Sequence, residues 1–180
     1  MKNFSADNLN YREFSLIEFR SEIDALPLLN DLPKEVKLID TFTLSTGSFV
    51  AFLTCNNLKN VFDTLRSHPS AIDGFFTNDT NMESLQAFYH LNKINISEGL
   101  IAAEIDSISA LFGIMDAALK KNLRVLDLKS QRVFAKNTLY LTGLANDVTA
   151  FSDEISKFNK VRFSTIPQLN EKLLTAFGKV

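Results

Sequence analysis

The chain has 180 residues, of which 46% are hydrophobic and 22% charged. These proportions are typical of a folded globular protein and exclude a disordered or fibrous class. Lys and Arg number 19 against 21 Asp and Glu, and no basic block indicates a nucleic-acid partner. The single cysteine, Cys55, excludes an intramolecular disulfide and lacks the neighbours of a zinc site, which suits a reducing cytoplasm.

The N-terminal segment has no apolar core of a secretory signal, and no stretch reaches the roughly 18 apolar residues that a membrane-spanning helix needs. We therefore expect a cytoplasmic protein with no membrane partner.

Local signals in the first half predict the order strand, helix, strand, strand, helix, strand, helix. The expected elements are a strand at 14–19, a helix at 22–32 capped by Ser21 and closed by Pro33, strands at 36–44 and 48–55, a helix capped by Asn57, a strand at 71–77 and a helix from Thr80 to about His90.

The second half predicts the same order. The expected elements are strands at 99–105, 123–130, 135–142 and 161–166, helices at 107–121 and 145–158, and a final helix with Pro167 in its first turn.

Equivalent residues recur at an offset close to 87, which is the signature of an internal repeat. Residues 36–40 match residues 123–127 as apolar, basic, apolar, apolar and acidic, and the further pairs are Val61 with Val148 and Phe76 with Phe163. The sequence therefore predicts an α+β fold of two tandem ferredoxin-like (split βαβ) domains, each with an extra C-terminal helix, at 1–92 and 93–180.

Several segments resemble the shell proteins of bacterial microcompartments. The quoted matches are Ser15-Leu16-Ile17-Glu18-Phe19-Arg20 with the family's G-L-I-E-T-R, Asp116-Ala117-Ala118-Leu119-Lys120 with D-A-M-L-K, Asn122-Leu123-Arg124-Val125-Leu126 with N-V-x-L-V, and Ser164-Thr165-Ile166-Pro167 with S-V-I-P. The order and doubling of these segments are similar to those of the non-permuted tandem members.

The resemblance implies a homotrimer that mimics a hexamer and tiles with other shell proteins into a microcompartment shell. It implies that the loops between the second and third strands of each copy line a central pore. The corresponding residues are Leu44, Ser45, Thr46, Gly47 and Ser48 in the first copy and Lys129, Ser130, Gln131 and Arg132 in the second. Lys34 and Lys120 correspond to the lysine at the tile edge.

The two loops differ in chemistry, because the first offers hydroxyl groups and the second is basic. If the second loop lines a threefold axis, three copies of Arg132 raise the local concentration of anions. We therefore expect passage of anionic or polar metabolites; the alternative is a solvated polar hairpin. Some members bind an iron–sulfur cluster through a cysteine in the first loop. Because Ser45 stands there and Cys55 lies at the far end of the strand, we expect no cofactor and no metal.

An enzyme is disfavoured, because the sequence has no phosphate-binding glycine loop, nucleophile elbow or metal-spaced set of ligands. Glu18 and Glu104 form a repeated pair, but carboxylates at strand ends are more often structural groups with hydrogen bonds. The alternative to a shell protein is a trimeric regulator that binds a small molecule, because ferredoxin-like units also form sensory trimers.

Overall fold

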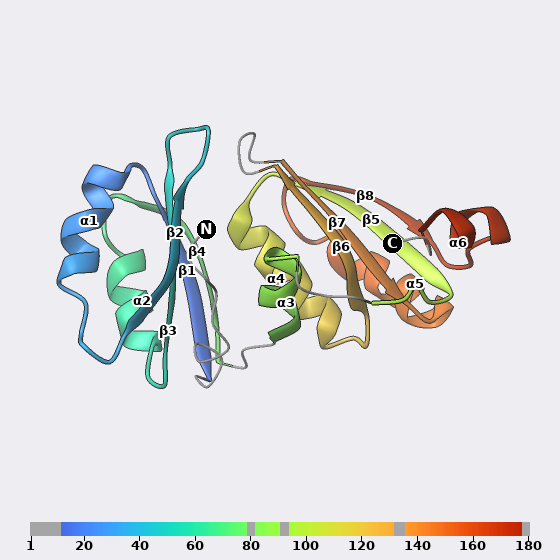
Figure 1. Ribbon diagram of the computed structural model, residues 1–180, viewed down its shortest axis with the longest axis horizontal. Helices are drawn as coiled ribbons and strands as arrows, with labels where there is room; N and C mark the ends of the chain where they lie inside the picture. Colours follow the sequence, from blue (N-terminus) through green and yellow to red (C-terminus); the bar gives the residue numbers. More distant parts are fainter. Residues whose placement is uncertain (1–11, 79–81, 91–93, 132–135, 178–180) are drawn as a thin grey trace. The chain divides into compact units, whose positions relative to one another are not determined.

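In the computed structural model, the described residues are 12–78, 82–90, 94–131 and 136–177. The chain divides into two compact units, residues 1–80 and 81–180, shown in Figure 1. Each unit has its own four-stranded antiparallel sheet. No helix within the described ranges is long and apolar enough to cross a membrane.

The first unit contains one complete split βαβ fold. Its elements are β1 (Glu13–Phe19), α1 (Glu22–Asn30), β2 (Lys37–Thr43), β3 (Phe49–Cys55), α2 (Lys59–Arg66) and β4 (Ala71–Thr77). The sheet order is β2-β3-β1-β4. Strand β3 is buried along its whole length, and the apolar residues that contact α1 and α2 form the core.

The second unit repeats this fold and carries a helix before and after it. Its elements are α3 (Met82–Phe88), β5 (Gly99–Ile105), α4 (Ile108–Leu119), β6 (Arg124–Gln131), β7 (Lys136–Gly143), α5 (Ala145–Ile155), β8 (Val161–Ile166) and α6 (Glu171–Phe177). The sheet order, β6-β7-β5-β8, is that of the first unit. The predicted α+β class and the tandem ferredoxin-like organisation are therefore confirmed.

Helix α3 packs against β6 and α4, so it belongs to the second unit although it follows the last strand of the first. The division between the compact units therefore falls earlier in the chain than the boundary between residues 92 and 93 that the repeat predicts.

Matching side-chain bonds show that the two units are copies in detail. The hydroxyl of Thr54 donates to the backbone oxygen of Glu13 at 2.7 Å, and that of Thr142 donates to the backbone oxygen of Gly99 at 2.8 Å. Both hydroxyls join the third strand of the unit to the start of its first strand. The pairing of the two edge strands also shifts at the same place, between Leu38 and Asp40 in β2 and between Val125 and Asp127 in β6.

The strand register shows how the offset between the copies grows along the chain. Equivalent pairs are Ser21 and Ser107 at 86, Asp40 and Asp127 at 87, Thr54 and Thr142 at 88, and Asp73 and Arg162 at 89. Each step is a net gain of one residue, and it includes differences in helix length, since α1 has 9 residues and α4 has 12. Phe76 and Phe163 are therefore not equivalent, because Phe76 pairs with Ser15 whereas Phe163 pairs with Ala103.

The cap contacts confirm one predicted helix start and correct another. Ser21 caps α1, because its hydroxyl accepts the backbone N–H of Asp24. Asn57 does not cap α2: the carboxylate of Glu13 accepts the N–H of Leu58 instead.

The final helix begins later than predicted. Pro167 is not in its first turn, because α6 starts at Glu171 and the side chain of Asn170 accepts the N–H of Leu173 at 3.0 Å. The preceding segment instead binds the residue before β5, where Leu169 donates its N–H to the oxygen of Glu98 at 2.8 Å.

Candidate functional site

The loop between β2 and β3 is a closed turn fixed by backbone bonds. Leu44 N–H donates to Ser48 O at 2.8 Å, and Gly47 N–H donates to Leu44 O at 2.9 Å. Gly47 has a φ of 87°, which favours glycine because a side chain is strained there. These bonds hold the tip of the loop, Ser45 to Gly47, at the end of the sheet.

A chain of hydroxyl groups joins this loop to the strand beneath it. Thr46 Oγ1 lies 2.9 Å from Ser48 Oγ, which donates to Glu18 Oε1 at 2.6 Å. Leu44 and Ser48 are buried, whereas Ser45, Thr46 and Gly47 are exposed. Of the five predicted pore residues in this loop, the three at its tip are therefore exposed to solvent, and the other two anchor the loop.

Glu18 is a titratable group that the loop contacts directly, through the hydroxyl of Ser48. Burial raises the pKa of its carboxyl above the ordinary value of 4.5; the hydrogen bond from Ser48 opposes this, and the negative charge of Asp73 adds to it. Asp73 lies directly opposite Glu18 on the neighbouring strand β4. The carboxyl of Glu18 is thus a hydrogen-bonded structural group, as the sequence favoured, but its connection to the loop through Ser48 was not predicted.

The equivalent carboxylate in the second unit has the opposite neighbour. Glu104 lies opposite Arg162 on β8 and forms an ion pair with it. Because arginine takes the place of Asp73, the acidic pair of the first unit is replaced by a neutral one. The two ends of the repeat are therefore electrostatically different even though their backbones match.

The basic loop of the second unit is described only at its borders. Lys129, Ser130 and Gln131 end strand β6, and Arg132 lies outside the described residues. Lys129 is exposed, and its Nζ lies 5.2 Å from the centre of the Tyr140 ring.

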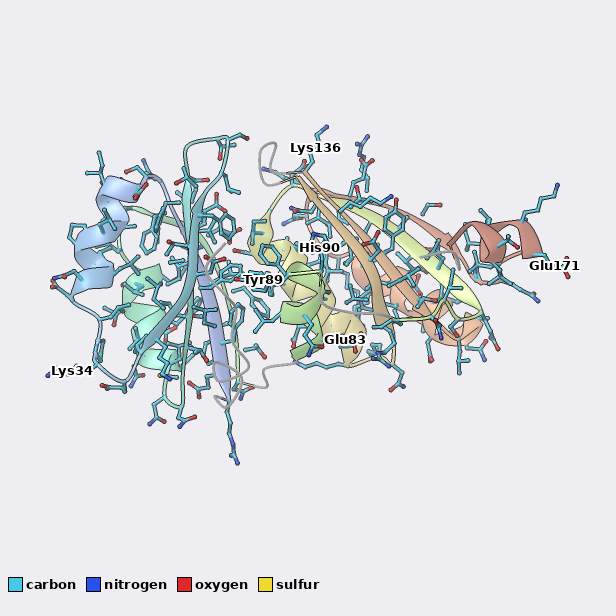
Figure 2. All side chains as sticks on the ribbon, viewed as in Figure 1. Lys34, Glu83, Tyr89, His90, Lys136 and Glu171 are labelled. Carbon is cyan, nitrogen blue, oxygen red and sulfur yellow. The ribbon has the colours of Figure 1, made fainter. Side chains whose placement is uncertain are left out.

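A polar cavity of about 230 Å³ lies beside these residues. It is lined by Glu104, Lys129, Lys136, Asn137 and Thr138. Figure 2 labels Lys136 at this end of the sheet, and Asn137 is fixed below it by a bond from its amide to Ile105 O at 3.2 Å. Two lysines against one carboxylate give this end of the second unit a positive excess, which would favour an anion.

The two predicted tile-edge lysines occupy different settings. Lys34 is exposed in the turn before β2 and points outward from its unit (Figure 2). Lys120 caps the end of α4, and its ammonium group contacts the Asp116 carboxylate at 2.7 Å. Lys120 therefore has an ion-pair partner on its own helix, and its exposure leaves it able to contact a neighbour.

Cys55 lies at the end of β3, buried, with the N–H of Asn57 bonded to its sulfur at 3.3 Å. Ser45 stands at the opposite end of that strand, beyond its first residue. Among the described residues, no group of three or more His, Cys, Asp and Glu side chains could hold a metal ion.

Comparison with known proteins gives a likeness in fold over most of the chain. No family model matches the sequence, and no curated protein matches it. A solved structure matches in fold: it is a microcompartment protein from Desulfitobacterium hafniense DCB. The match has a TM-score of 0.67 and 16% identity, and it covers 89% of this chain and 97% of that chain. The chain thus has the fold of two tandem microcompartment domains, each an antiparallel four-stranded sheet with helices.

Proposed function

We propose that this protein is a structural, non-enzymatic shell protein of a bacterial microcompartment. The observation that carries the proposal is the extent of the likeness, because both units of this chain and nearly all of the microcompartment protein superpose. A shared fold alone does not define a function. Here the segments that resemble shell proteins in sequence add to the likeness in fold: residues 15–20 lie in and directly after β1, and residues 116–120 close α4.

In this proposal three copies form a ring that mimics a hexamer, and the rings tile into a sheet with one another and with other shell proteins. Closed cyclic symmetry uses one interface three times, so a small domain can build a flat tile. Lys34 and Lys120 stand at the tile edge, where exposed ammonium groups can bind carboxylates or carbonyl oxygens of the next tile.

The pore of the proposed ring is lined by the two kinds of loop. The exposed tip of the first loop, Ser45 to Gly47, offers hydroxyl groups and a small residue; the second offers Lys129 and Arg132. Such a pore favours small polar or anionic metabolites, because charged rings raise the local concentration of the opposite charge.

Electron microscopy of the concentrated protein tests the proposal. Extended sheets or tubes of rings support a shell protein, and replacing Lys120 with Ala should reduce the sheets while leaving the rings intact. Discrete rings that never tile, and whose thermal stability rises with a small ligand, would instead identify a trimeric ligand-binding regulator.

A further inference from the structure

Helix α3 covers the open edge of the second unit. It lies beside α4 and against the edge strand β6 (Figure 1). Three of its side chains, Leu85, Ala87 and Phe88, are buried, and the ring centres of Phe88 and Phe112 on α4 are 5.3 Å apart. This contact completes the helical layer over the second sheet.

Polar bonds fix α3 in register with the edge strand. Glu83, labelled on α3 in Figure 2, accepts the backbone N–H of Val125 at 3.0 Å through one oxygen and the guanidinium of Arg124 at 2.6 Å through the other. An edge strand presents unpaired N–H groups, and α3 satisfies one of them.

Helix α6 repeats the contact sequence of α3. Leu174-Thr175-Ala176-Phe177 matches Leu85-Gln86-Ala87-Phe88 with three of four residues identical, at an offset of 174 − 85 = 89. The same offset relates β4 to β8, the strands that precede the two helices. Helix α6 is therefore the counterpart of α3 in the second copy.

The surroundings of α6 are unlike those of α3. It projects past the end of the second sheet (Figure 1), and Leu174 is only half-buried whereas Leu85 is buried. Glu171, in its first turn, points away from the unit (Figure 2). Among the side chains that the structure describes, those of α6 are thus covered less by their own unit than those of α3.

The first unit has the face that α6 lacks. In the second unit, Ser109, Phe112 and Val125 are 6%, 1% and 0% exposed; α3 contacts Phe112 through Phe88 and Val125 through Glu83, and Ser109 lies three residues before Phe112 on α4. Their counterparts at offsets of 86, 86 and 87 are Ile23, Leu26 and Leu38, which are 83%, 52% and 47% exposed. Large apolar residues gathered on one exposed face mark an interaction surface. We name these three residues the α1–β2 face.

We propose that α6 docks on the α1–β2 face of a second copy of this chain. Because α3 follows the first unit and covers the unit that comes next, α6 should also cover the unit that comes next, and that unit belongs to another copy. The charges fit this assignment, since Lys37 takes the place of Arg124 and Glu171 stands one residue before the position of Glu83. The contact is head-to-tail, so repeated docking forms a ring when the rotation between successive copies closes, as the proposed ring of three requires.

This inference rests on the self-association in the proposed function and names the surfaces that make it. It does not require that the rings tile into a shell. Replacing Leu26 with Asp places a charge in the docked surface and should weaken association by about 100-fold or more, as truncation of a central apolar contact does. Sedimentation equilibrium of the full chain measures this. Removal of residues 171–180 should have the same effect, which guards against an artefact of the Leu26→Asp substitution.

The matched control is Leu144→Asp, because Leu144 is 56% exposed and lies outside the proposed contact. It should leave the oligomer unchanged. Circular dichroism checks that all variants keep their fold. If Leu26→Asp and the truncated chain associate as tightly as the parent, the inference is wrong.

Mixing two single-cysteine variants identifies which copy is bound. By the repeat, Leu26 and Phe177 correspond to the pair Phe112 and Phe88, so Leu26→Cys chains mixed with Phe177→Cys chains should form disulfides between the two variants under mild oxidation. The native Cys55 is buried and does not compete. A double variant that instead gives only an intrachain bond in a monomer would place α6 on its own first unit and overturn the proposal.

The outcomes separate the two proposals. Cross-linked rings that never form sheets would keep this inference and reject the shell. Sheets formed by the truncated chain would keep the shell and reject this inference.

Discussion

Ser48 Oγ donates a 2.6 Å hydrogen bond to Glu18 Oε1, and this contact ties the first candidate pore loop to the centre of its sheet. Glu18 also faces Asp73 across the β1–β4 pair. Burial is the main reason that the carboxyl pKa is raised, with the charge of Asp73 acting in the same direction. The site therefore holds a carboxyl group whose ionisation disfavours the folded state.

The first prediction concerns the pH dependence of stability. Because its pKa is raised in the folded state, Glu18 binds more protons in the folded than in the unfolded state once the pH rises above 4.5. The stabilisation that comes from this protonation is full below that pH and is lost as the pH rises through the folded-state pKa. Glu18→Gln keeps an oxygen for Ser48 and removes the charge. We expect its melting temperature to exceed that of the parent at pH 7, with the difference closing towards pH 4.

The matched control for that experiment is Glu104→Gln in the second unit. Glu104 is exposed and pairs with Arg162, so the substitution should change the free energy of unfolding by no more than about 0.5 kcal/mol and give no gain at pH 7. Calorimetric scans of both variants from pH 4 to 8 decide the matter. Equal pH profiles for the parent and Glu18→Gln would show that Glu18 titrates normally.

The second prediction concerns the backbone of the first loop. Gly47 has a φ of 87°, and no heavy atom lies within 4 Å of the position that a Cβ would occupy. The cost of Gly47→Ala is therefore backbone strain alone, about 1 kcal/mol of unfolding free energy. Urea denaturation measures it, and Ser45→Ala at the exposed tip should be close to neutral. A neutral Gly47→Ala would indicate that the turn can change its conformation without loss.

The third prediction concerns which residues the second unit needs. A fragment of residues 81–180 should unfold cooperatively. A fragment of residues 94–180 lacks α3 and should be less stable by about several kcal/mol, because loss of the buried Phe88 leaves Phe112 uncovered. Thermal unfolding followed by circular dichroism compares the two. A peptide of residues 81–93 added in trans should restore part of the loss. Equal stability of the two fragments would place α3 outside the second fold.

The order of elements could be predicted because hydrophobic alternation, turn residues and the repeat all agreed. Each predicted strand end lies within one residue of the observed end. Local rules failed where a distant group intervened. Asn57 obeys the capping preference, yet the carboxylate of Glu13, 45 residues earlier in the chain, accepts the N–H of Leu58. Pro167 suits a first turn, yet the bond from Leu169 to Glu98 holds that segment outside the helix, which begins at Glu171.

The candidate site was predicted at the level of its loops and not of its contacts. The positions of Ser45 to Gly47 follow from the strands on either side. The bond between Ser48 and Glu18 joins residues 30 apart, and no local pattern indicates which carboxylate lies beneath a hairpin. The exchange of Asp73 for Arg162 also depends on an offset of 89 between β4 and β8, which the strand register shows and the predicted offset of 87 misses.

The fourth prediction concerns the charge of the proposed pore. Arg132 lies outside the described residues, but it follows the exposed Lys129 on β6, and a ring of three copies would multiply its charge. Arg132→Glu reverses that charge, so isolated rings of the variant should bind inorganic phosphate about tenfold or more weakly at low salt, as calorimetry measures. The affinities of the variant and the parent should converge as ionic strength rises, because salt screens the charge. Lys34→Glu is the matched control, because it makes the same change of charge in the turn before β2, at the opposite end of that strand from the loop. If Arg132→Glu binds phosphate as the parent does, or if Lys34→Glu weakens binding equally, the loop does not set the selectivity and is the solvated hairpin that its polarity alone would explain.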